Sequence, residues 1–170
     1  MSEPFIRAEQ AADKNGVRAV NERAFGGRAE ADIVEALHRA HTAVVALVAE
    51  MGAEVVGHIL FSPVDVEQAN GKRLVGLAPM AVAPDYQRQG IGSQLVREGL
   101  ARCRANGFDG VVVLGHAEYY PRFGFVLAMQ FGLRSEYDVP ADVFMAIELG
   151  SGSLDGVSGL LRYHKAFAGA

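Results

Sequence analysis

The sequence contains little that could cross-link it or bind a metal through sulfur. Its 170 residues include a single cysteine, Cys103, which excludes an internal disulfide and a cysteine-rich metal site. No His, Cys, Asp and Glu residues recur with the spacing of metal ligands, so we expect no metal cofactor. Cys103 falls on the apolar side of a predicted helix, so we expect it to pack in the core.

Long apolar runs and a strong charge are also missing. No apolar run reaches the roughly 18 residues of a membrane-spanning helix. The start Met1-Ser2-Glu3-Pro4 lacks the basic and then apolar order of a signal peptide. We therefore expect no membrane partner and a cytoplasmic location. The net charge of -4 argues against a nucleic-acid partner held by neutralised phosphates.

The length and composition suit one folded core. With 50% hydrophobic residues in 170, the chain can bury one sizeable core but is short for a second full domain. We predict one domain over residues 1–149 and, from the spacer Gly150-Ser151-Gly152-Ser153 onward, a C-terminal tail over residues 150–170. The tail is apolar enough that we expect it to pack on its own domain or on a partner subunit, which leaves a homodimer open.

Hydrophobic periodicity predicts alternating helices and strands. The predicted helices cover residues 9–25, 30–41 and 91–105. The predicted strands cover residues 5–7, 43–49, 55–61, 77–83, 111–114, 129–133 and 143–149, with a turn at 67–72. His58 lies inside an apolar strand, where a lone histidine is expected to be a hydrogen-bonded core residue without a chemical role.

A glycine-containing segment joins one of these strands to a helix. Gln87-Arg88-Gln89-Gly90-Ile91-Gly92-Ser93 lies between the strand that ends near Pro84 and the helix that begins at Ile91. Glycine lets a backbone approach a ligand closely, and the unpaired amides at a helix N-terminus attract anions. The strand at 111–114 follows, so the pattern predicts a crossover unit with an anion site at the start of its helix.

Two families of nucleotide-binding loops fit this segment poorly. A P-loop requires Lys and then Ser or Thr after its last glycine, but Ser93-Gln94 follows here. A dinucleotide loop requires a third glycine where Leu95 stands, and an acidic residue at the end of the next strand, whereas Asp109 precedes that strand. A P-loop is therefore excluded, and a nicotinamide cofactor is the weaker alternative.

The segment instead resembles the GNAT superfamily of N-acetyltransferases. The family signature, Gln/Arg-x-x-Gly-x-Gly/Ala, matches Gln87-Arg88-Gln89-Gly90-Ile91-Gly92. The stretch 77–86 resembles the family's fourth strand. Tyr119-Tyr120-Pro121-Arg122-Phe123-Gly124-Phe125 is similar to the tyrosine-containing segment that ends in Gly-Phe in many members.

The resemblance implies a fold and a cofactor. The fold is α/β (α+β), a single domain with a mixed, mostly antiparallel twisted sheet flanked by helices, in which the fourth and fifth strands splay apart. Pro79 fits that strand because proline cannot donate to a β-ladder. The implied cofactor is acetyl-coenzyme A (acetyl-CoA), whose pantetheine arm would pair with the backbone of Met80, Ala81 and Val82. Its pyrophosphate would bind the loop residues Gln87, Arg88, Gln89, Gly90, Gly92 and Ser93.

The implied reaction is direct acetyl transfer to a primary amine within a ternary complex. By resemblance, Tyr120 occupies the position of the general acid, with Tyr119 as the less favoured choice. His116 is a candidate general base, although Glu118, a desolvating pocket or a water chain would also serve. The acceptor is a small-molecule or peptide amine that the sequence does not identify. A non-catalytic module that binds or senses acyl-CoA on the same fold is the alternative.

Overall fold

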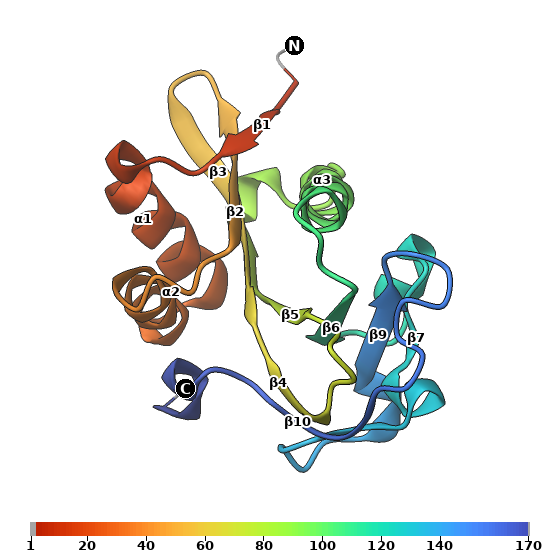
Figure 1. Cartoon of the computed structure of the whole chain (residues 1–170). Coiled ribbons are helices and arrows are strands. Elements are labelled where there is room, and N and C mark those ends of the chain that lie inside the picture. Colours follow the sequence, from red (N-terminus) through yellow and green to blue (C-terminus); the bar gives the residue numbers. More distant parts are fainter. Residues whose placement is uncertain (1–2, 170) are drawn as a thin grey trace. The chain divides into compact units, whose positions relative to one another are not determined.

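A computed structural model describes residues 3–169 of the chain (Figure 1). Met1, Ser2 and Ala170, which belong to the predicted domain and tail, lie outside the described residues. The helices are α1 (Lys14–Phe25), α2 (Ala29–Arg39) and α3 (Ile91–Ala105). The strands are β1 (Phe5–Ala8), β2 (Val45–Met51), β3 (Glu54–Pro63), β4 (Asp65–Gln68), β5 (Leu74–Val82), β6 (Gly110–Leu114), β7 (Val126–Leu127), β8 (Leu133–Ser135), β9 (Phe144–Glu148) and β10 (Ser158–Arg162).

The chain forms two compact units. Of the described residues, unit 1 comprises 3–62, 78–99 and 165–169, and unit 2 comprises 63–77 and 100–164. The strands of unit 1 follow the order β1-β2-β3-β5, and those of unit 2 the order β5-β6-β9-β7, because β5 contributes its end to unit 1 and its beginning to unit 2. Unit 2 also contains a separate three-stranded sheet with the order β4-β10-β8.

In unit 1, alternate residues of β3 face helices on opposite sides of the sheet. Strands β1, β2 and β3 are antiparallel neighbours. Leu60 of β3 packs in a cluster with Val17 of α1 and Leu37 of α2. Phe61, the next residue, faces α3 instead, where a side chain added at Gly99 would collide with the Phe61 ring. The two-residue period of a strand therefore places α1 and α2 on one face and the start of α3 on the other.

In unit 2, the sheet is built around β6. The beginning of β5, Leu74–Gly76, pairs with Gly110–Val112 of β6 in parallel, and β9 pairs with β6 and β7 in antiparallel. Leu74, Val112 and Phe144 are buried in one cluster with Leu161 of β10. The mixed, mostly antiparallel sheet with flanking helices confirms the predicted fold class. The predicted splay of β5 from β6 beyond the paired residues stays a prediction.

Two local predictions were wrong. Of residues 129–133, predicted as a strand, only Leu133 lies in one, as the first residue of β8; the others lie in a 3₁₀ turn over Ala128–Phe131 that ends at Gly132, where φ is +74°. Glu67 and Gln68, predicted to lie in a turn, belong to β4, which pairs with β10 about ninety residues later in the chain. A pairing over that distance leaves no local signal in polar residues.

The described residues of the predicted tail are divided between the two units, those up to His164 in unit 2 and those from Lys165 in unit 1. Strand β10 pairs with β4 in antiparallel and with β8 in parallel in unit 2. The 3₁₀ helix Lys165–Gly169 contacts α2 in unit 1, where Ala166 and Phe167 pack against the cluster of Leu37 and Leu60. Across residues 3–169, the structure contains no helix with the length and apolar character needed to cross a membrane.

A buried polar network connects the start of α1 with β3. His58 of β3 is fully buried, and its Nε2 donates to Oε1 of Glu9 over 2.8 Å. The Asn21 side chain on α1 lies 3.3 Å from Nδ1 of His58 and donates to the Val17 carbonyl. An amide NH₂ facing Nδ1 requires that nitrogen to accept, which places the ring hydrogen on Nε2. His58 is thus a hydrogen-bonded core residue, as predicted.

The same Glu9 carboxylate also bonds a histidine at the surface. Its Oε2 accepts from Nε2 of His38 on α2 over 3.0 Å. Burial alone would raise the pKa of Glu9, but the hydrogen bonds from His38 and His58 outweigh it and lower this pKa to about 2. The bond from Glu9 raises the pKa of His38 above its usual 6.5.

We predict that Glu9→Gln destabilises the protein in a pH-dependent way. A carboxyl with a lowered pKa in the folded state contributes stability above its unfolded pKa of 4.5, and this contribution is lost as the pH falls towards about 2. The contribution of His38, whose pKa is raised, is complete below pH 6.5 and is lost as the pH rises through its folded pKa. The difference in unfolding free energy between wild type and variant should therefore be largest between pH 4.5 and 6.5.

Urea unfolding followed by circular dichroism across this pH range measures the difference. Glu3→Gln, which changes an exposed carboxyl, is the matched control and should match the wild type throughout. A Glu9→Gln penalty that stays constant from pH 6 down to pH 2 would contradict the assigned hydrogen bonds.

Candidate active site

The predicted cofactor residues all lie in unit 1, on the end of β5, the loop after it and the first turn of α3. In β5, Ala81 is buried and packs against Val20 of α1, while Met80 and Val82 on either side are half-buried. This alternation follows the period of a strand. One face of the strand end is thus fixed by the core, and the other is partly open.

The loop between β5 and α3 is held by its own side chains. The side-chain Nε2 of Gln87 donates to the Val82 carbonyl over 3.0 Å, and the side-chain Nε2 of Gln89 donates to the Asp85 carbonyl over 3.3 Å. Arg88 and Gly90 have left-handed backbones, with φ of +64° and +87°. A side chain added at Gly90 would meet nothing within 4 Å, so the space beside the loop is open.

The start of α3 presents amides that precede its first hydrogen-bonded turn. The first helical bond is donated by Gln94 to the Gly90 carbonyl over 3.0 Å. The amides of Ile91 and Gly92 therefore come before the intrahelical ladder, at the positive end of the helix dipole. Arg88 is exposed in the loop and adds a positive charge. Ser93 is half-buried in the first turn. Open space, left-handed residues and helix-end amides together fit a diphosphate.

Tyr120 and His116 lie together in unit 2. Tyr120 begins a 3₁₀ turn (Tyr120–Phe123), and the His116 carbonyl accepts from the Tyr119 amide over 3.1 Å and the Tyr120 amide over 3.4 Å. The Tyr120 ring packs so closely on Gly115 that a side chain there would collide with it. The rings of Tyr119 and Phe125 also contact it edge-on, with their centroids 5.1 and 5.6 Å from the centroid of the Tyr120 ring.

The environment of Tyr120 keeps its phenol protonated. Burial, and to a lesser extent the neighbouring Tyr119, raises the pKa of Tyr120 to about 12. Although the ring is buried, its hydroxyl makes no hydrogen bond to any residue between 3 and 169. The hydroxyl is therefore a donor that the protein itself leaves uncommitted.

A hollow of about 600 Å³ lies on unit 2 next to this turn. Its lining includes His116 and Glu118 from the segment after β6 and Asp142 from the segment before β9. All three side chains are exposed, so they face solvent. The sequence analysis missed Asp142, since nothing in its local pattern marks it and its place beside His116 depends on the pairing of β6 with β9.

The residues that the structure describes contain no group of three or more His, Cys, Asp or Glu side chains arranged to hold a metal ion. Cys103 is buried on α3, and burial raises the pKa of its thiol to about 12, so it is a core residue.

Comparisons with known proteins show what the chain is similar to. The sequence model described as "Acetyltransferase (GNAT) family" matches residues 11–125. The "Uncharacterized N-acetyltransferase YhbS" of Escherichia coli strain K12 is 39% identical over 164 residues, which cover 96% of this chain and 98% of the relative. The "Uncharacterized N-acetyltransferase YjhQ" of the same strain is 40% identical over 134 residues, covering 76% of this chain and 74% of the relative.

Two solved structures are similar over nearly the whole chain. The crystal structure of the GNAT family N-acetyltransferase YhbS from Escherichia coli in complex with CoA has a TM-score of 0.92 at 37% identity, covering 99% of this chain and 93% of that one. The crystal structure of a GNAT family acetyltransferase from Brucella melitensis in complex with acetyl-CoA has a TM-score of 0.81 at 36% identity, covering 98% and 99%.

Proposed function

Because this chain belongs to the GNAT family and is an N-acetyltransferase, we propose that it transfers an acetyl group from acetyl-CoA to a primary amine by direct attack in a ternary complex. The observation that carries the proposal is the loop before α3, where left-handed residues and helix-end amides border open space. The complexes of two similar proteins with CoA and with acetyl-CoA support it. Family membership also disfavours the non-catalytic module and the nicotinamide cofactor.

The residues of β5 and the loop bind the cofactor in this proposal. Backbone groups of Met80, Ala81 and Val82 pair with the pantetheine amides as an added strand would. The pyrophosphate accepts hydrogen bonds from main-chain amides of Gln89, Gly90, Gly92 and Ser93, with Gln87 holding the loop and Arg88 adding charge.

The chain's groups then stabilise the charges that form. Acetyl-CoA supplies a thioester whose carbonyl carbon the neutral amine attacks, and CoA leaves as a thiolate. A main-chain amide at the end of β5 stabilises the carbonyl oxygen as it becomes negative, because its position is fixed before the charge develops. Tyr120 donates a hydrogen bond to the departing sulfur.

The pKa of Tyr120 refines the role that the family resemblance gives it. The thiolate that leaves is a weaker base than a phenolate, because its thiol has a pKa near 8.5 by analogy with cysteine. With a phenol pKa of about 12, complete proton transfer to the sulfur is uphill. Tyr120 is therefore proposed to stabilise the thiolate as a hydrogen-bond donor, and its proton need not leave. His116 is proposed to accept the proton that the amine loses, directly or through water.

The hollow lined by His116, Glu118 and Asp142 is the proposed entrance for the acceptor. Two carboxylates and no lysine or arginine line it, which favours an amine that carries a further positive charge. A cytoplasmic location, the absence of metal and nucleic-acid partners, and a homodimer stay predictions.

We predict that Gly92→Glu abolishes tight binding of acetyl-CoA without unfolding the protein. A carboxylate in the first turn of a helix is favourable to the helix dipole, so stability should be kept. The same side chain blocks and repels a diphosphate, so the dissociation constant measured by calorimetry should rise about tenfold or more, which is about 1.4 kcal/mol. Gln94→Glu adds the same charge to an exposed neighbouring position and is the control for charge alone. Equal affinity of wild type and Gly92→Glu would remove the loop from the cofactor site.

We predict that Tyr120→Phe lowers kcat by about a hundredfold, the lower range for loss of one hydrogen-bond donor to the negative charge that develops in the transition state. The dissociation constant for acetyl-CoA should change little, since only one oxygen is deleted. Thiol release with an active amine measures kcat, and calorimetry measures binding. Tyr119→Phe, which deletes the neighbouring hydroxyl, should keep kcat within about twofold. Because the pKa of Tyr120 is about 12, the wild type should not lose this donor between pH 7 and 10. Unchanged turnover in Tyr120→Phe would exclude the proposed role.

We predict that Glu118→Gln and Asp142→Asn raise KM for amines with a second positive charge and leave kcat nearly unchanged. Each variant removes a charge that binds the substrate and the transition state alike. The preference for a second positive charge is measured by thiol release with polyamines, lysine peptides and amines that carry no charge besides the amine itself. If KM for the amines without a second charge rises as much as KM for the dicationic amines, the hollow does not select its substrate by charge.

A further inference from the structure

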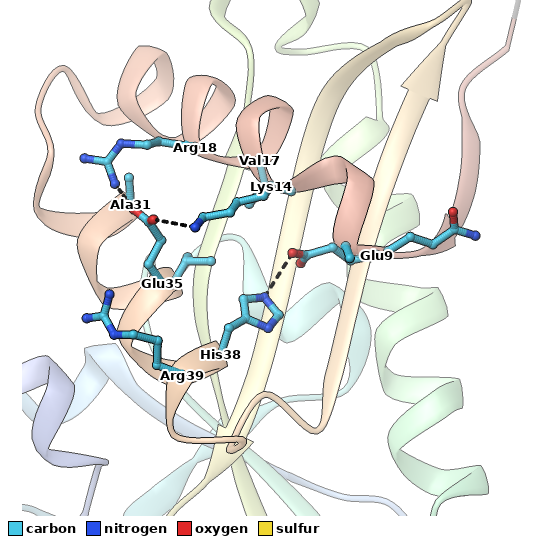
Figure 2. A pocket seen from close by; sticks show the side chains of 11 residues that line it. Glu9, Lys14, Val17, Arg18, Ala31, Glu35, His38 and Arg39 are labelled. Atoms are coloured by element: carbon cyan, nitrogen blue, oxygen red, sulfur yellow. Dashed lines mark hydrogen bonds and ion pairs between the residues drawn. The ribbon is translucent and has the colours of Figure 1, made fainter.

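Unit 1 contains a cavity that the proposed reaction does not use, separate from the hollow on unit 2. It has a volume of about 480 Å³ and lies between α2 and the segment from Glu9 to the first turns of α1 (Figure 2). None of its lining residues belongs to β5, to the loop at 87–90 or to α3. Val17, Ala31 and Val34 are buried and form its apolar part. Volume and lining fall in the range of small-molecule sites.

Both carboxylates that line this cavity are already paired with protein cations. Oε1 of Glu35 lies 3.7 Å from Nζ of Lys14, and its Oε2 is paired with Arg18. Glu9 accepts from His58 with one oxygen and from His38 with the other. Figure 2 shows the contacts of Glu35 with Lys14 and of Glu9 with His38 on opposite sides of the cavity. A cationic ligand would therefore have to compete for acceptors that are in use.

The lining side chains that are not fully engaged with other residues of the protein are hydrogen-bond donors. Arg39 is exposed and makes no hydrogen bond or ion pair with any residue from 3 to 169. Lys14, 71% exposed, has among the described residues only its long contact with Glu35. His38 uses Nε2 for Glu9 and leaves Nδ1 unengaged within the same described residues, and Nδ1 is a donor when the ring carries a positive charge. The bond from Glu9 also raises the pKa of His38, which favours its positive form.

From this arrangement we propose that the cavity binds a small organic carboxylate with an apolar body. The carboxylate accepts from Arg39, with Lys14 and His38 as further donors, because a guanidinium binds a planar carboxylate with two parallel bonds. The body lies against Val17, Ala31 and Val34. Arg18 is taken up by Glu22, Asp32 and Glu35, so Arg39 and Lys14 supply the positive charge that a carboxylate needs.

The test compares three probes of one shape on the purified full chain. 3-Methylbutanoate, 3-methylbutan-1-ol and 3-methylbutan-1-amine differ only in the head group. Calorimetry and thermal unfolding should show binding of the carboxylate, with an affinity at least about tenfold above that of the alcohol and the amine. The same affinity is expected with the cofactor site saturated by CoA.

Variants place the binding in this cavity. Arg39→Gln, which breaks no ion pair within residues 3–169, should weaken binding of the carboxylate about tenfold. Arg28→Gln removes an exposed arginine just before α2 that does not line the cavity and should have no effect. Ala11→Leu adds bulk at an exposed lining position and should weaken binding without any change of charge. Equal binding of the three probes, displacement by CoA, or wild-type affinity in Arg39→Gln would overturn the proposal.

Discussion

The close approach of α3 to β3 determines where the loop at residues 87–90 lies. Gly99 of α3 lies against the Phe61 ring with no room for a side chain, so the helix can come nearer to the sheet than a larger residue would allow. Nearer the start of α3, Leu95 and Ile91 lie against Gly57 of the same strand. Two glycines, one on each element, thus fix the first half of the helix along β3. The amides at its N-terminus are held by this packing and by the loop's glutamine side chains, before any ligand is bound.

Much of this arrangement could be predicted from the sequence because its signals are local. The loop 87–93 and α3 are encoded by glycines at fixed spacing and by a helical repeat of apolar residues, and α3 begins at Ile91 as predicted. The burial of Cys103 and of His58 followed from apolar neighbours within the same element. These features need no information from distant parts of the chain.

The parts that were missed depend on long-range contacts. The partners of His58 include Glu9, which is 49 residues away, and no local pattern links a polar residue before a helix to a buried strand histidine. Met129 and its neighbours alternate as a strand does, but Gly132 with a positive φ ends a 3₁₀ turn there. Asp142 comes next to His116 only through the pairing of distant strands. Residue type and spacing thus indicated the family, while the neighbours across the sheet needed the structure.

The order β4-β10-β8 in the small sheet has a consequence for synthesis of the chain. The central strand, β10, follows both of its neighbours in the sequence. While the ribosome is still adding residues before Ser158, β4 and β8 have been made but their shared partner has not. This sheet can therefore close only as a late event of biosynthesis, after the strand that joins its two edges has emerged.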